Sequence, residues 1–212
     1  MNKHKLVSWI IAILLIFLAG WSVVYVKHAE KINSEKIAKE EKKQQLQKKE
    51  DKNANMRYPI KWRKSSQTTK YPNVFDDKNL WIKISQKKQR LYVMSGKKQR
   101  YQMYVSLGTH AAGYSNESKK VFPTGTFKIS DKRGEFYYNQ VTGNGGRYWI
   151  SWKDNGKYVI QSVPTNEHGK YLVANAQSLG SQVDTNNSIW LSVRDAKWFY
   201  KNINGGTKLV IE

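Results

Sequence analysis

Cysteine is absent from the 212 residues of this sequence, and histidine occurs only four times. Without cysteine the chain can form no disulfide, no zinc–thiolate site and no thiol nucleophile. The two histidines within residues 58–212, His110 and His168, are scattered and show no metal-ligand spacing. We therefore expect neither a metal site nor any other cofactor.

Acidic residues are also few: 16 Asp and Glu stand against 37 Lys and Arg, which gives a formal net charge of +21. An excess this large implies anionic surroundings. Nucleic acid, anionic lipid headgroups and phosphate-bearing wall polymers all satisfy that requirement. Aromatic residues are plentiful, with 8 Trp, 13 Tyr and 6 Phe. They supply enough apolar bulk for a core and argue against global disorder.

One long apolar run lies near the N-terminus. Residues 6–26, LVSWIIAILLIFLAGWSVVYV, carry no charge, and as a helix they would span roughly 30 Å, the thickness of a bilayer core. We interpret this run as a single-pass transmembrane anchor. The lysines before it predict that residues 1–5 are cytoplasmic and that the rest of the chain lies on the wall side. A cleaved signal peptide is the alternative, but the run exceeds the usual length of such segments.

A charged stretch follows the apolar run. Residues 27–57 are rich in Lys, Glu and Gln, with oppositely charged pairs at helical spacing such as Glu35 and Lys39. Apolar positions are too sparse for a regular heptad seam, although a coiled-coil dimer is an open alternative. We interpret the stretch as a solvated, partly helical linker.

Residues 58–212 form the predicted globular domain. Short segments in it alternate apolar and polar residues, such as LWIKIS at 80–85 and QRLYVMS at 89–95, and Gly and Asn clusters separate them. Good helical content occurs only at 189–203. The pattern therefore predicts a mainly β domain with one helix near its C-terminal end.

Several motifs of this domain, taken in order, resemble the catalytic domain of the L,D-transpeptidases (the YkuD-type fold). FPTGTFKI at 122–129 is similar to the family's Thr-Pro-x-Gly-x-Phe turn, with Phe122 in place of Thr. RYWISWKDNGKYVIQSVP at 147–164 is similar to the strand pair that ends in Ile-His or Phe-His, and LSVRDAKWFYKNINGGTKLVIE at 191–212 to the helix and last strand after the nucleophile. The resemblance implies a β-sandwich with one C-terminal helix.

Members of that family form or exchange peptidoglycan cross-links. A cysteine attacks an amide of a stem peptide and expels D-alanine, and the acyl group then passes to an amine of another stem. The family's fingerprint is Ser-His-Gly-Cys-(Ile or Val)-Arg, with a second His on the preceding strand. In this chain other residues occupy six of these cleft positions: Thr185 for Ser, Asn186 for His, Asn187 for Gly, Ser188 for Cys, Trp190 for Arg and Gln161 for the second His.

These substitutions change what the cleft can do. A serine hydroxyl needs a general base within about 2.6–3.2 Å, whereas a thiol supplies some thiolate by itself. The amide of Gln161 accepts a hydrogen bond but takes up no proton near neutrality. A relocated base is a less favoured possibility: His168 from a lid-like loop after the Gln161 strand, or His110 from a loop after an early strand.

Two substitutions leave alternatives open. Trp190 either fills the space of the family's arginine as a packed side chain or offers a surface on which a sugar or peptide stacks. Asn187 stands where the family keeps a glycine, and because asparagine tolerates a positive φ, we expect the turn to survive with that conformation at Asn187.

The resemblance implies a membrane-anchored, wall-facing L,D-transpeptidase homologue with a degenerate catalytic centre. It would bind peptidoglycan stem peptides or anionic wall polymers, or regulate a partner wall enzyme. The alternative is an active acyl transferase that uses Ser188 as nucleophile and backbone N–H groups at 187–188 as an oxyanion hole. Nucleic-acid binding is disfavoured, because the anchor would place the domain outside the cell.

Overall fold

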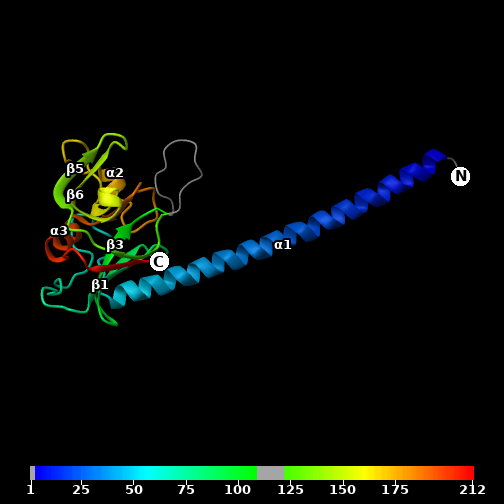
Figure 1. Ribbon diagram of the computed structural model, residues 1–212. Helices are drawn as coiled ribbons and strands as arrows, with labels where there is room; N and C mark the ends of the chain where they lie inside the picture. The colour runs from blue at the N-terminus through cyan, green and yellow to red at the C-terminus, as the bar shows by residue number, and fades with distance from the viewer. Residues whose placement is uncertain (1–2, 109–121) are drawn as a thin grey trace. The chain divides into compact units, whose positions relative to one another are not determined.

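The computed structural model describes residues 3–108 and 122–212, without the side chains of residues 3–20 and 23 (Figure 1). The chain divides into two compact units, Met1–Glu50 and Asp51–Glu212. His110 lies outside the described residues.

A long helix, α1 at Lys3–Asn53, makes up the first unit and reaches the start of the second. Neither Gly nor Pro occurs between positions 21 and 53, and Lys, Glu, Gln and Ala are all strong helix formers. Among the described residues, no helix is both long and apolar enough to cross a membrane. The predicted anchor at 6–26 falls mainly on residues whose side chains lie outside the description, so the anchor stays a prediction.

The second unit is built on strands. Within residues 51–108 and 122–212 there are nine: β1 Leu80–Ser85, β2 Arg90–Ser95, β3 Lys98–Ser106, β4 Gly125–Lys128, β5 Arg133–Asn139, β6 Asn144–Lys153, β7 Tyr158–Ser162, β8 Ser188–Leu191 and β9 Lys208–Ile211. Three short helices accompany them: η1 Asp154–Gly156, α2 Val173–Ala176 and α3 Val193–Asn202. The predicted mainly β character is confirmed.

All nine strands belong to one sheet, in the order β4-β9-β1-β2-β3-β8-β7-β6-β5. The pairs β1–β9 and β7–β8 are parallel, and the other pairs are antiparallel. Strand β3 joins the two halves, because Lys98–Tyr104 pairs with β2 and Val105 and Ser106 pair with β8. The sheet curls so that the segment after its end strand β4 meets β6, where Ser130 N donates to Ser151 O at 2.9 Å. The expected sandwich is thus two facing halves of one continuous sheet.

The predicted C-terminal helix is present but begins later than position 189. Ser188–Leu191 instead extends beside β7 as strand β8, and the helix α3 starts at Val193. Ser192 caps it, since its hydroxyl accepts a hydrogen bond from Asp195 N at 3.1 Å. The helical periodicity of the sequence did not separate a buried apolar strand from the first turn of a helix.

Two apolar clusters lie on opposite faces of the β7–β8 pair. Ile160 and Ile189 are register partners and belong to the main core with Leu191. Gln161 and Trp190, the next partners, point the other way, as alternate residues of a strand must. On that side Trp190 joins a second cluster: Met56, Tyr104, Val163, Ala176 and Leu179.

The segment between α1 and β1 packs on this second cluster. Ile60 and Trp62 contact it, and the ring of Trp62 meets that of Tyr171 edge-on at 5.4 Å. Further along, Ser66 N at 3.0 Å and Tyr71 Oη at 2.7 Å both donate to the carboxylate of Asp195 on α3.

Asp195 is completely buried, and burial raises its pKa to about 6, although the hydrogen bonds from Ser66, Tyr71 and Ser192 offset part of the rise. The Asp195 carboxylate therefore links the segment between α1 and β1 to the helix α3 through hydrogen bonds.

Candidate functional site

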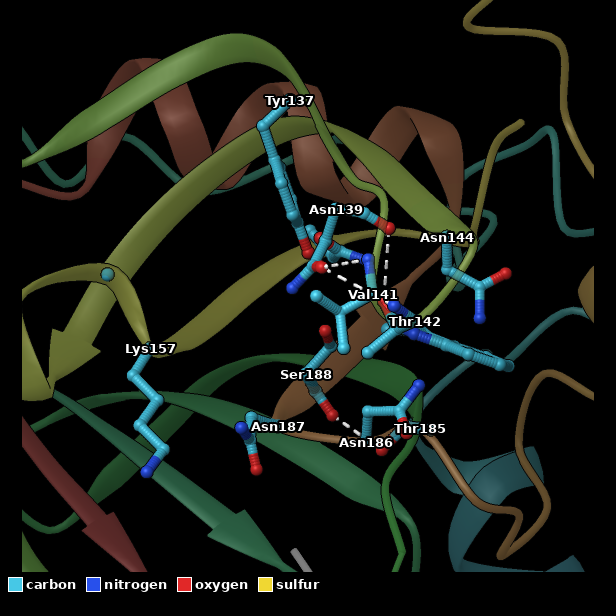
Figure 2. A pocket seen from close by; sticks show the side chains of 13 residues that line it. Tyr137, Asn139, Val141, Thr142, Asn144, Lys157, Thr185, Asn186, Asn187 and Ser188 are labelled. Atoms are coloured by element: carbon cyan, nitrogen blue, oxygen red, sulfur yellow. Dashed lines mark hydrogen bonds between the residues drawn. The ribbon is translucent and has the colours of Figure 1, made fainter. Parts of the chain in front are cut away.

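A pocket of about 540 Å³ opens on the second face of the β7–β8 pair, where the hairpin of β5 and β6 forms one wall (Figure 2). The six substituted positions all line it, although they come from two separate parts of the chain. The described residues that line the pocket are Tyr137, Asn139, Val141, Thr142, Asn144, Gly156, Lys157, Gln161, Thr185, Asn186, Asn187, Ser188 and Trp190.

Parallel pairing brings Gln161 and Ser188 together. Ser188 is the register partner of Val159, and Gln161 that of Trp190, so Ser188 and Gln161 lie two register positions apart, on the same face. Both are largely buried, Ser188 at 8% and Gln161 at 1% exposed. The amide of Gln161 lies against the backbone of Gly146 in β6, in the space that a Cβ at that position would fill.

Tyr137 of β5 completes this group, and sequence reasoning missed it. Burial raises the pKa of Tyr137, while the side chains of Ser188 and Gln161, within hydrogen-bonding reach of the phenol, offset part of the rise. The phenol is therefore neutral at ordinary pH. No motif marks Tyr137 in the sequence, because only the pairing of β5 with β6 carries it to the pocket.

The turn before β8 is closed by its own hydrogen bonds. Ser188 N donates to Thr185 O at 3.1 Å, and the Thr185 hydroxyl donates to Ser188 O at 2.6 Å. The positive φ of this turn is at Asn186, 55°, and not at Asn187 as we expected. Asn186 suits that conformation, because the Asp184 side chain accepts its N–H at 2.9 Å in a local turn. Thr185 itself is 1% exposed and supports the turn.

Trp190 is only 3% exposed and packs with Tyr104, Val163 and Leu179. A stacking platform needs a free ring face, which a side chain this deeply buried does not offer. The geometry therefore favours the packing interpretation, although Trp190 is among the residues that line the pocket.

No histidine is among the described residues that line the pocket. His168 lies in a turn after β7, where its side chain is exposed and its Nε2 is 3.5 Å from Glu167 Oε1. The same lining contains no carboxylate, and its one charged residue is Lys157. The structure thus surrounds the Ser188 hydroxyl with amides and hydroxyls.

Comparison with known proteins assigns this architecture. A model of the L,D-transpeptidase catalytic domain, YkuD, matches residues 79–211. A Bacillus subtilis (strain 168) protein, YciB, which carries the name of an L,D-transpeptidase, is 34% identical over 152 residues, covering 72% of this chain and 74% of that protein. The chain belongs to the L,D-transpeptidase family.

Solved structures similar to this L,D-transpeptidase family member are more distant. An L,D-transpeptidase from Mycobacterium smegmatis has 14% identity and a TM-score of 0.48, over 63% of this chain and 58% of that one. A second, from Xylanimonas cellulosilytica DSM 15894, has 11% identity and a TM-score of 0.47, over 66% and 64% of the two chains. The chain spans about six tenths of the length of the solved chains it matches. At these TM-scores the likeness adds nothing to the family assignment.

Proposed function

We propose that this L,D-transpeptidase homologue binds peptidoglycan stem peptides, on which its family acts, in the pocket at Ser188 without turning them over. One observation carries the proposal: the polar side chains beside the hydroxyl, those of Tyr137 and Gln161, include no proton acceptor.

Acyl transfer from an amide requires the attacking hydroxyl to lose its proton as the new bond forms. A neutral phenol and a carboxamide can donate or accept hydrogen bonds, but neither takes that proton near neutrality. Tyr137 would act as a base only as phenolate, and burial raises its pKa further from neutrality. Ser188 therefore lacks the activation that a serine nucleophile needs.

The backbone N–H groups at 187–188, which we expected to form an oxyanion hole, are also less suited to that role. The N–H of Ser188 donates to Thr185 O at 3.1 Å, inside the turn. An oxyanion donor must point at the place where negative charge develops. This hydrogen bond argues against the alternative, an acyl transferase that uses Ser188 and the N–H groups at 187–188.

The N-terminal sequence supports a location for this binding. We infer that residues 6–26 anchor the chain in the cell membrane, with the domain on the wall side. The net charge of +21 suits a wall that contains anionic polymers. Regulation of a partner wall enzyme is a further role that a bound but uncleaved stem peptide would allow.

Two measurements on the full-length chain in neutral detergent test the proposal. Co-sedimentation with purified peptidoglycan should be retained, and the intact mass should not change after incubation with stem peptides or a carbapenem. Ser188→Ala is the matched control, because it removes only the hydroxyl. An adduct that forms on the natural chain and is lost in Ser188→Ala would establish the acyl transferase instead, and failure to sediment would refute binding.

A further inference from the structure

Trp149 of β6 lies beside the pocket and takes no part in either apolar core. Its ring meets the ring of Tyr137, a residue of the pocket lining, edge-on at 5.7 Å. It belongs to neither of the apolar clusters that the described residues form. Trp190 is buried in one of those clusters, whereas Trp149 is half-buried and partly exposed.

The ring of Trp149 is held by one edge. Its Nε1 donates to Phe136 O on β5 at 3.4 Å. Gly134, the register partner of Trp149, leaves room for this edge, because a Cβ there would lie only 2.7 Å from Nε1. A ring that is already fixed in this way loses little conformational freedom when a ligand packs on its face.

Trp149 lies a short peptide length away from the polar end of the pocket. Gly146, whose backbone lies against the Gln161 amide, is three residues before Trp149 on the same strand. At about 3.3 Å per residue these two positions are roughly 10 Å apart. Tyr137 connects them, since its ring contacts Trp149 and its phenol is within hydrogen-bonding reach of Ser188. Roughly 10 Å is also the length of three residues of extended peptide.

A stem peptide is attached to a sugar at its N-terminal end. An amide joins its first residue to the lactyl group of an N-acetylated amino sugar of the glycan strand. One face of such a pyranose ring carries mainly C–H groups, which pack favourably against an aromatic ring. A half-buried indole at this distance from Ser188 is therefore placed to receive the sugar of a peptide that ends in the pocket.

We propose that Trp149 is the stacking site for the sugar from which a bound stem peptide extends, while the free end of that peptide lies in the pocket at Ser188. This inference rests on the proposed binding of stem peptides. It adds a sugar subsite outside the pocket lining, and it sets the peptide between the sugar and the free end at about three residues.

Two matched series of probes test this length. Alanine peptides of one, three and six residues carry either an acetyl group or N-acetylmuramic acid at the N-terminus, so both members of each pair have the same charge. Ligand-observed NMR on the full-length chain in neutral detergent measures their affinities. We expect the sugar to strengthen binding of the three-residue peptide by about fivefold.

The other two lengths should gain less. One residue cannot span the two positions, so the sugar should change its affinity by less than about twofold. Six residues form a longer flexible connection, which lowers the effective concentration of the sugar at Trp149. Equal gains from the sugar at one and at three residues would overturn the proposal.

Trp149→Ala should remove the gain, so that both members of the three-residue pair bind equally. Trp149→Phe keeps an aromatic face and should retain part of the gain. Trp81→Ala is the matched control and should leave the gain unchanged. Trp81 is also half-buried, and its Nε1 donates to Gly96 O at 2.7 Å, but it is not among the described residues of the pocket lining.

Gly134→Ala tests the support of the ring while Trp149 stays in place. The added Cβ should displace the Nε1 edge and reduce the gain from the sugar, and circular dichroism checks that each variant is folded. This variant also decides the question if Trp149→Ala does not fold. A fivefold gain that persists in Gly134→Ala and in any folded Trp149 variant without an aromatic ring would refute the stacking site.

Sedimentation with peptidoglycan separates the two proposals. If the chain sediments but the sugar adds nothing to the affinity of any peptide, the sugar site is refuted and the binding function stands. If the chain does not sediment, the binding function itself fails.

Discussion

The two faces of the β7–β8 pair are equally buried but differ in chemistry. On one face Ile160 and Ile189 are 1% and 0% exposed and pack in the main core. On the other face Gln161 and Ser188 are 1% and 8% exposed, and they are polar. The register of β7 with β8 sets both faces, because side chains along each strand point alternately to one face and the other.

The difference between the two faces indicates which residues the fold depends on. The apolar face must keep its volume, because a gap in a packed core is costly. The pocket face must only keep its polar atoms compatible with burial, and it carries Ser188, Gln161, Asn187 and Trp190. On our proposal, the cleft residues of this family member have changed while its fold has been kept.

The largest effect is expected on the apolar face. Ile189→Ala should lower the free energy of unfolding by roughly 3–4 kcal/mol, because Ile189 is fully buried and the cavity would be lined by the main core. Urea denaturation followed by fluorescence measures the change. A loss below about 1 kcal/mol would mean that the two faces do not differ as described.

A pH dependence of similar size is expected from Asp195, which holds the segment over the pocket-side cluster. Its pKa of about 6 in the folded state exceeds the ordinary 3.8. The folded state thus binds the proton of Asp195 more tightly than the unfolded state does. The stability that comes from this protonation is fully present below pH 4 and is lost as the pH rises through about 6. The difference of about 2 pKa units corresponds to at most about 3 kcal/mol.

Urea denaturation between pH 4 and pH 8 measures this dependence. Asp195→Asn should flatten the profile in that range, since an amide does not titrate. A profile in the natural chain that rises steeply with pH across this interval and is unchanged in Asp195→Asn would contradict the assignment.

A smaller effect is expected at the start of α3. Ser192→Ala removes the acceptor for Asp195 N and should cost about 1 kcal/mol of unfolding free energy. Ser192→Thr should recover most of the loss, which separates capping from packing. Equal losses in both variants would mean that the cap contributes little.

On the pocket face the expected change is smaller still. Ser188→Ala should alter the free energy of unfolding by less than about 1 kcal/mol, because it removes one hydroxyl beside other polar groups. The same denaturation experiment compares it with Ile189→Ala, its neighbour in the chain. A loss as large as that of Ile189→Ala would show that the pocket face also supports the fold.

Acylation should also respond to changes on the pocket face. Ser188→Cys combined with Gln161→His should restore acylation by a carbapenem only in part, because Asn186 and Trp190 still replace the family's second fingerprint residue and its arginine. Intact mass spectrometry over time measures the rate, with each single variant as control. Full restoration would show that the surrounding cleft never lost its catalytic form.

Local patterns predicted most of what depends on neighbours in sequence. The alternation of apolar and polar residues predicted the strands β1 and β2. Tyr137 was not predicted as a pocket residue, because it reaches the pocket only through the pairing of β5 with β6. The left-handed residue was misplaced by one position, since whether Asn186 or Asn187 adopts it depends on the Ser188–Thr185 hydrogen bond, which no residue preference reveals.

Strand β3 carries one more consequence. Only Val105 and Ser106 of β3 pair with β8, so the ladder that joins the two halves of the sheet here is two residue pairs long. Short ladders open more often than long ones. Amide protons of the β3–β8 ladder should therefore exchange with deuterium before those between β1 and β2. Opening of this ladder would move Ser188 away from β3, while the parallel pairing of β8 with β7 remains.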